Sequence, residues 1–146
     1  MEAFVSFETL FSLSSMFVLP FWLLMIFLPH WGWTKRIIQS PWIIIGPSLI
    51  YVVLVIPQAS NIMGEFGSLD QVTALLSTPF GTVVGWVHFL AFDLFVGRWA
   101  YLESREYEIN AFLMAPILFF TFMLGPIGFV AYLIVRTMYL VRTKRN

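Results

Sequence analysis

The sequence contains no cysteine and few charged side chains. Without cysteine, the chain has no disulfide, no thiolate nucleophile and no metal site built on thiolates. Only 11% of its residues are charged, whereas soluble domains have about 25%. Eight acidic residues balance eight basic ones, so no excess of charge favours nucleic acid as a partner. The sequence also lacks a glycine-rich phosphate loop, a Ser-His-Asp set and zinc-ligand spacing, so no metal site is expected.

What the chain has in abundance is apolar surface. Hydrophobic residues make up 60% of its 146 residues, and aromatic residues 18%. A chain of this length has a large surface for its volume, and so apolar a surface would aggregate in water. We therefore expect the lipid bilayer to be its solvent, as for an integral, multi-pass membrane protein.

Four apolar segments are long enough, or nearly so, to cross a membrane, which takes about 20 residues of helix. They lie at residues 7–28, 41–56, 79–102 and 111–139. They predict an all-α fold, an integral membrane four-helix bundle that forms a single transmembrane domain over residues 1–146. The second and third segments begin with a capping residue followed by proline, Ser40-Pro41 and Thr78-Pro79.

Gly46-Pro47 in the second segment and Gly125-Pro126 in the fourth interrupt these helices. A repeated two-helix unit, as in some transporters, is one interpretation. Little else aligns between the two halves, so we interpret both pairs as kinks that serve packing. The carbonyl groups that the prolines free then need partners on neighbouring helices.

The connection between the second and third segments predicts a short helix. Ser68 and Gln71 have the spacing of a capping box. Four apolar residues follow at helical spacing, Leu69, Val72, Leu75 and Leu76. We predict an amphipathic helix over residues 69–76 that lies at the membrane interface.

Charge does not decide the orientation of a four-span chain. One side receives the basic residues of the first and third connections, Lys35, Arg36 and Arg105. The other side receives those that follow the last helix, Arg142, Lys144 and Arg145. The positive-inside count is therefore nearly a tie. We interpret the charged stretch "LESREYEIN", residues 102–110, as a solvated connection, and expect Arg136 to reach an interface or to pair with an acid there.

Three ionisable residues stand inside the third segment: His88, Asp93 and Arg98. At a rise of about 1.5 Å per residue, His88 and Asp93 lie about 3 to 5 Å from a hydrocarbon centre near Leu90, and Arg98 about 12 Å from it. Arg98 can therefore extend to an interface. A charge near mid-membrane costs at least a few kcal/mol, so an unpaired Asp93 would stay protonated.

Asp93 and His88 are the candidate catalytic residues, because an intramembrane ionisable group is a functional candidate by default. They point about 140° apart on the helix and cannot share one face. The structural alternative for His88 is a satisfied core imidazole. For Asp93 it is a hydrogen bond to another helix, through Tyr51, Ser48, Thr121 or Tyr132. His30, the only other histidine, lies too far from the depth of His88 for a two-histidine haem.

The stretch "LSTPFGTVVGWVHFLAFDLFVGRWAYLESRE" resembles the signature of the ABA4-like (DUF4281) family. The similarity continues, with less specific motifs, in "FVLPFWLLMIFLPHW" and "APILFFTFMLGPIGFVAYLIVR". Plant members of that family are plastid membrane proteins needed to make neoxanthin. Those carry transit peptides and this chain does not, so the resemblance implies a cyanobacterial member in a plasma or thylakoid membrane.

The resemblance implies a link to carotenoid (xanthophyll) metabolism and a bound carotenoid in place of any other cofactor. Converting an epoxy-carotenoid to an allenic one needs an acid and a base, which Asp93 and His88 would supply. The expected ligand-binding residues are the aromatic and basic side chains around them, Trp86, Phe92, Phe95, Arg98 and Trp99.

Three hypotheses remain open from the sequence. The first is an isomerase-like enzyme of the carotenoid pathway or its accessory subunit. The second is a non-enzymatic membrane scaffold that binds pigment or lipid in a larger complex, since no complete catalytic set is present. The third is a small transporter, which with four spans would have to form a homo-oligomer.

Overall fold

The computed structural model describes residues 6–143, and over this range it confirms the all-α class. Four helices are long and apolar enough to cross a membrane. These helical stretches, Phe7–Phe27, Gly32–Phe66, Pro79–Glu106 and Ala111–Val141, overlap the four predicted segments. Their long helices are α1 (Phe7–Phe27), α3 (Trp42–Val55), α6 (Pro79–Glu106) and α7 (Ala111–Thr143).

Short helices join these long ones. A helix that the sequence did not suggest, α2 (Gly32–Gln39), follows α1. After α3 the chain continues through a 3-10 turn (Ile56–Gln58), α4 (Ala59–Ile62) and a second 3-10 turn (Met63–Phe66). The helix expected at residues 69–76 is α5 (Leu69–Leu76).

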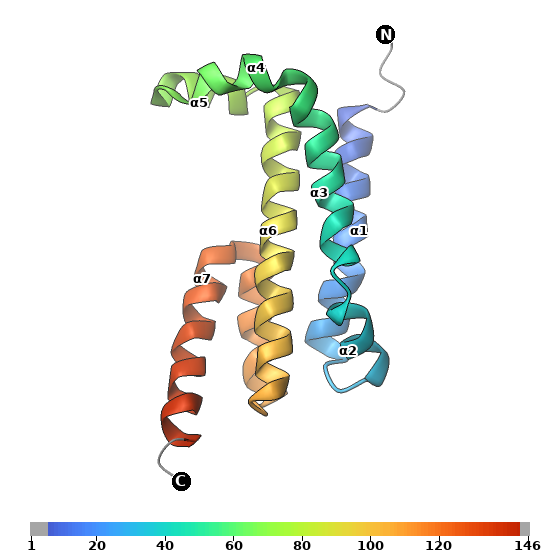
Figure 1. The fold of residues 1–146 in the computed structure, drawn as a ribbon, viewed down its shortest axis with the longest axis vertical. Coiled ribbons are helices and arrows are strands. Elements are labelled where there is room, and N and C mark those ends of the chain that lie inside the picture. Colours follow the sequence, from blue (N-terminus) through green and yellow to red (C-terminus); the bar gives the residue numbers. More distant parts are fainter. Residues whose placement is uncertain (1–5, 144–146) are drawn as a thin grey trace.

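The long helix α6 stands at the centre of the molecule (Figure 1). Helices α1 and α3 pack along α6, and the first half of α7 packs against both α6 and α1. The second half of α7 lies on the side of α6 away from α3. The helices α4 and α5 cross the end at which α6 begins, and α2 lies at the opposite end. We call these two ends the α5 end and the α2 end.

Side-chain caps start four of the helices; that of α7 is Asn110, whose Oδ1 accepts a hydrogen bond from the backbone N–H of Phe112. The hydroxyls of Ser6, Ser68 and Thr78 accept hydrogen bonds from backbone N–H groups at the start of α1, α5 and α6. The cap expected from Ser40 is wrong. Helix α3 begins after Pro41 without a side-chain cap, and Ser40 instead ends α2.

The core lies between α6, α1 and the first half of α7. Val87, Leu94 and Ala100 of α6 are buried there with Trp22 of α1. Gly97 permits a close approach of α1 to α6, because a Cβ at this position would lie 2.3 Å from the Trp22 ring. The outward faces of the long helices are apolar as well, as expected of helices surrounded by lipid.

Helix α7 is a hairpin and not a straight crossing. Its backbone leaves the helical region at Leu124 (φ −144°, ψ 50°). A Cβ at Gly128 would lie 2.2 Å from the backbone nitrogen of Thr121, although seven residues of straight helix span about 10 Å. The chain therefore reverses between these residues. The two halves of α7 run side by side, and both of its ends lie at the α2 end (Figure 1).

The other Gly-Pro pair behaves differently. Gly46-Pro47 lies inside α3, and the helix continues through it. The interpretation of Gly-Pro pairs as kinks therefore fits α3. At Gly125-Pro126 the chain does more than kink, because it reverses its direction.

Candidate functional site

Asp93 lies in the middle of α6 and faces the reversal in α7. A Cβ at Gly125 would lie 2.1 Å from Asp93 Oδ1, so the carboxyl group occupies the space that any larger residue at position 125 would need. The reversal frees backbone N–H and C=O groups that helices normally pair. A carboxyl group beside these polar groups is in a better environment than one that faces hydrocarbon.

The predicted hydrogen bond of Asp93 to another helix is wrong for all four candidate partners. Ser48 and Thr121 donate to backbone carbonyls of their own helices, those of Ile44 and Ile117. Tyr132 donates to a different acid, and the Tyr51 ring lies against His88. Within residues 6–143, the structure gives the Asp93 side chain no hydrogen-bond partner.

His88 points to the other side of α6, toward α3. Its imidazole stacks on Phe92, with ring centroids 4.7 Å apart, and lies 5.5 Å from the ring of Tyr51. The ring is exposed at the surface of the protein. It therefore faces the lipid side of the bundle and is not a satisfied core imidazole.

His88 and Tyr51 line a cavity of about 410 Å³ between α3, α6 and the short helices at the α5 end, which we call the α3–α6 groove. Its other lining residues are apolar and include Val55, Ile62, Phe66, Leu75 and Val84. The groove therefore has one polar pair in an otherwise apolar wall.

The structure does not bring Asp93 and His88 together. His88 lines the α3–α6 groove and Asp93 does not, because the carboxyl group lies against Gly125 of α7. Asp93 follows His88 by five residues, which places the two side chains about 140° apart around the helix. One small molecule in the groove would contact the imidazole and not the carboxyl group.

The expected ligand-binding residues also point to different neighbours. Trp86 packs on Phe11 of α1, and its Nε1 donates to Ser15 Oγ at 2.9 Å. Phe92 and Phe95 remain more than half exposed, at 59% and 51%. Phe92 alone of these lies beside His88.

Arg98 and Trp99 face the α2 end. Arg98 Nε donates to the Ile38 carbonyl at 2.7 Å, and Nη2 donates to the Gln39 carbonyl at 2.5 Å. The guanidinium thus caps the last turn of α2, where a positive charge is favourable. Trp99 packs edge-on against Tyr132, with centroids 5.0 Å apart. Both residues hold helices together.

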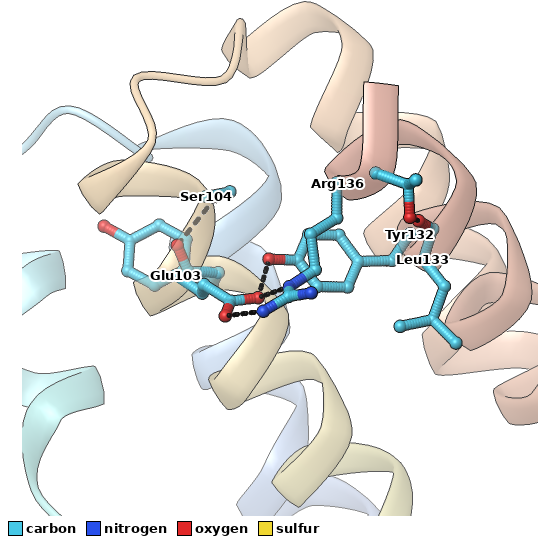
Figure 2. Close-up of polar contacts among 7 residues, drawn as sticks. Glu103, Ser104, Tyr132, Leu133 and Arg136 are labelled. Atoms are coloured by element: carbon cyan, nitrogen blue, oxygen red, sulfur yellow. Dashed lines mark hydrogen bonds and ion pairs between the residues drawn. The ribbon is translucent and has the colours of Figure 1, made fainter. Parts of the chain in front are cut away.

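A polar cluster that the sequence reasoning missed ties α6 to the second half of α7 (Figure 2). Glu103 accepts a hydrogen bond of 2.6 Å from the Tyr132 hydroxyl. Arg136 binds the same carboxylate through Nε at 2.7 Å and Nη2 at 3.0 Å. Glu103 is therefore no solvated loop residue. The expected pairing of Arg136 with an acid near an interface is confirmed.

Sequence spacing could not suggest this cluster. In a straight helix, Arg136 would lie about 37 Å from Ala111, which follows closely on the end of α6. Only the reversal at Gly125 returns Tyr132 and Arg136 to the depth of Glu103. The one sequence signal was the Gly125-Pro126 pair.

A second cavity, of about 690 Å³, lies at the α2 end between α1 and the α6–α7 connection. His30, Arg105 and Asn110 contribute polar groups to it. Arg105 already donates hydrogen bonds to Ser104 Oγ and to the Ile109 carbonyl. Among the described residues, no three His, Asp or Glu side chains gather as metal ligands would.

A protein-family model described as ABA DEFICIENT 4-like matches residues 9–132. The chain belongs to the ABA DEFICIENT 4-like family. The match runs from the first turn of α1 to Tyr132, so this ABA4-like core includes the α3–α6 groove, Asp93 and the reversal of α7. It ends four residues before Arg136.

One characterised protein similar to this ABA4-like chain is Protein ABA DEFICIENT 4, chloroplastic, of Arabidopsis thaliana. The two are 27% identical over 111 residues, which is 70% of this chain and 50% of the relative. The aligned part thus spans about half the length of that relative. No solved structure matches the chain.

Proposed function

We propose that this protein acts in carotenoid (xanthophyll) metabolism inside the membrane. Membership of the ABA DEFICIENT 4-like family over residues 9–132 is the observation that carries the proposal. The structure is compatible with it in two respects. The chain is a multi-pass membrane protein, and apolar pigments dissolve in membranes. On its lipid side, one apolar groove contains polar groups.

The reaction that we propose is an acid–base, isomerase-like step on a xanthophyll, performed by this chain or by a complex in which it is an accessory subunit. Opening an epoxide needs an acid, and forming a new double bond needs a base to take a proton. In this arrangement His88 meets the ligand and takes both roles: its imidazolium gives a proton to the epoxide oxygen, and the neutral imidazole then takes the proton that leaves carbon, which restores the imidazolium. Asp93 is a positioning residue that holds α7, because it faces Gly125 and lies outside the groove.

The second candidate is a non-enzymatic scaffold that binds pigment or lipid in a larger membrane complex. It is favoured by the separation of Asp93 from His88, which leaves the groove without a complete acid–base pair. Exposed aromatic side chains on α6, those of Phe89, Phe92 and Phe95, offer flat apolar contacts for a pigment or a membrane partner.

Pigment analysis of a deletion strain tests the proposed function. We expect an altered profile of xanthophylls, including cis isomers, and recovery of the normal profile when the gene is returned. A profile identical to that of the parent strain would overturn the proposal. Returning Asp93→Asn, which keeps the shape of the side chain and removes its titration, should restore the profile if Asp93 only positions α7.

His88→Phe separates the two candidates. For the acid–base step, this variant should accumulate the substrate xanthophyll although the protein is present in normal amount. For the scaffold, pigment should co-purify with the wild-type protein, and the profile should respond to loss of the protein but not to His88→Phe. Mass spectrometry of what co-purifies from the native membrane identifies the ligand in either case.

We place this activity in the plasma or thylakoid membrane of a cyanobacterium. The support is the family resemblance together with the chloroplastic relative. Separation of the two membranes followed by immunoblotting tests the location. Recovery of the protein in neither membrane would contradict it.

A further inference from the structure

We propose that the α3–α6 groove binds the oxygen-bearing terminal ring of a carotenoid, with His88 and Tyr51 as its two polar contacts. This inference rests on the proposed function and adds to it a site and the part of the ligand that the site recognises.

The first argument is the unsatisfied polar pair. Within residues 6–143, the structure gives neither the imidazole of His88 nor the hydroxyl of Tyr51 a hydrogen-bond partner. Both line the same groove, and their rings are 5.5 Å apart. Hydrocarbon offers no hydrogen bonds, so a ligand oxygen beside this pair would satisfy groups that lipid chains leave unpaired. An imidazole offers both a donor and an acceptor, and a phenol can act as either.

The second argument is the shape of the groove. Its volume of about 410 Å³ lies within the range of small-molecule sites, about 300 to 1,000 Å³, and such sites combine apolar walls with a few placed polar groups. Its inner end is His88, and its outer end is closed by Ile62, Phe66 and Leu75 of the short helices. Phe80 and His88 are eight residues apart along α6, or about 12 Å.

The third argument is the roof that closes the groove. Helices α4 and α5 lie across the end of α6 (Figure 1). Ile62 and Leu75 line the groove, and they also line an adjoining cavity to which Asn61 and Glu65 contribute polar groups. A ring that fills the groove beneath such a roof would place its oxygen against His88 and Tyr51 at the inner end, and its methyl-branched polyene would leave the groove toward mid-membrane. An oxygen-bearing ring fits this arrangement better than the acyl chain of a phospholipid, which would leave His88 and Tyr51 at the inner end unpaired.

The test is binding of defined carotenoids to the purified full chain in nanodiscs. Violaxanthin carries oxygen on its rings, and β-carotene has the same length without ring oxygen. We expect wild type to bind violaxanthin about 30-fold tighter, because two hydrogen bonds of about 1 kcal/mol each add about 2 kcal/mol of binding free energy. His88→Phe and Tyr51→Phe should each reduce this preference. His30→Phe is the matched control, because His30 lines the cavity at the α2 end, and it should leave the preference unchanged.

A variant that fills the groove tests the location independently of hydrogen bonding. The position of a Cβ at Gly85 lies 3.5 Å from Leu76 Cδ2, an ordinary contact, so Gly85→Leu places its larger side chain in the groove without a backbone clash. It should lower the affinity for both carotenoids at least tenfold. Gly32→Leu is its control, because nothing lies within 4 Å of a Cβ there.

Two outcomes of the binding experiments would overturn the site. One is equal binding of both carotenoids by wild type. The other is occupancy of the groove by acyl chains of ordinary phospholipid only, with no displacement by either carotenoid. Failure of the proposed function would give another result: the deletion strain would keep its normal pigments, while His88-dependent binding would persist in nanodiscs. If instead the deletion changes the pigments while Gly85→Leu fully complements it, the function stands and the site is wrong.

Discussion

The Tyr132 hydroxyl is the simplest of the contacts that hold the returning half of α7, because it makes one hydrogen bond, of 2.6 Å, to Glu103. Tyr132 is fully buried. Tyr132→Phe removes the bond and keeps the ring against Trp99. A hydrogen bond to a charged group contributes about 1.5 to 3 kcal/mol, so we expect the free energy of unfolding to fall by about that amount. Denaturation in mild detergent, followed by tryptophan fluorescence, measures it.

Tyr107→Phe is the control for that measurement. The Tyr107 ring lies 5.9 Å below the Arg136 guanidinium, and its hydroxyl has no hydrogen bond within the described part of the chain. The substitution should change stability little. Equal losses from Tyr107→Phe and Tyr132→Phe would mean that the bond to Glu103 does not hold α7.

At Gly125, the carboxyl group of Asp93 leaves no space for a side chain. In Gly125→Ala, the new Cβ would lie 2.1 Å from Asp93 Oδ1, so the carboxyl group or the reversal of α7 must move. Overpacking of this kind costs about 1 to 3 kcal/mol, and we expect that loss in the same denaturation experiment. Gly32→Ala is the control, because a Cβ at Gly32 meets nothing within 4 Å.

Asp93→Ser in the Gly125→Ala background tests the cause of the loss. The shorter side chain makes room for the new methyl group, so the double variant should recover part of the stability that Gly125→Ala loses. Such a recovery of stability would mean that the effects of the two substitutions are not additive, as expected of residues in contact but not of distant ones. Additive losses would indicate that the two residues do not touch.

At the level of whole elements, apolar periodicity and capping predicted most helices. The four long segments and α5 appear at nearly the expected residues because helix formation depends on local features: run length, Thr78-Pro79 at the start of α6, and Ser68 before α5. Helix α2 was missed. Its eight residues contain Lys35 and Arg36, and part of its stability comes from Arg98, which lies 60 residues away and binds the Ile38 carbonyl.

The reversal of α7 could not be predicted, because the same dipeptide has two outcomes in one chain. Gly46-Pro47 stays helical in α3, whereas the chain turns back at Gly125-Pro126. The difference lies in contacts from α6: Asp93 beside the reversal and Glu103 where α7 returns. Contacts between helices also decide the neighbours of Asp93 and His88. The sequence identified both residues as unusual, but it could not show that they face different helices or that Tyr51 lies beside His88.

A cross-link tests the hairpin directly, because the chain has no cysteine of its own. In the double variant Glu103→Cys with Arg136→Cys, a short bis-maleimide should join the two positions, which form an ion pair of 2.7 Å in the wild type. A straight α7 would hold them roughly 30 Å apart, because about 25 residues of helix separate Arg136 from the start of α7 and Glu103 lies near the end of α6. The matched control pairs Glu65→Cys, at the α5 end, with Arg136→Cys and should give no intramolecular product. Cross-linking of both pairs, or of neither, would contradict the hairpin.

For the molecule as a whole, the hairpin changes the distribution of charge between the two membrane surfaces. Lys35 and Arg36 lie in α2, Arg105 in the last turn of α6, and Arg142 in the last turns of α7, all at the α2 end. Arg98 and Arg136 bind groups at that end too. At the α5 end, the charged residues of the described chain are acidic: Glu8, Glu65 and Asp70. The near tie of a four-span chain becomes a clear asymmetry.

The positive-inside rule then gives an orientation. Basic residues near the ends of membrane helices stay on the cytoplasmic side, whereas acidic residues have little influence. We expect the α2 end to face the cytoplasm and the α5 end the opposite compartment. Single cysteines at Lys35, Glu65 and Arg142 measure this in a bacterial host that makes the protein in its plasma membrane, since a membrane-impermeant maleimide added to intact cells should label only Glu65→Cys. Permeabilised cells, in which all three should react, are the control for accessibility.

The three labelling positions distinguish an error in the fold from an error in orientation. A straight fourth crossing would place Arg142 on the same side as Glu65, so joint labelling of Arg142→Cys and Glu65→Cys would refute the hairpin. Labelling of Lys35→Cys and Arg142→Cys with protection of Glu65→Cys would leave the hairpin intact and reverse the orientation. In the expected orientation, the α3–α6 groove lies beneath α4 and α5 in the leaflet away from the cytoplasm. A carotenoid ring would then enter from that leaflet, whereas the cavity around His30 and Arg105 faces the cytoplasmic side.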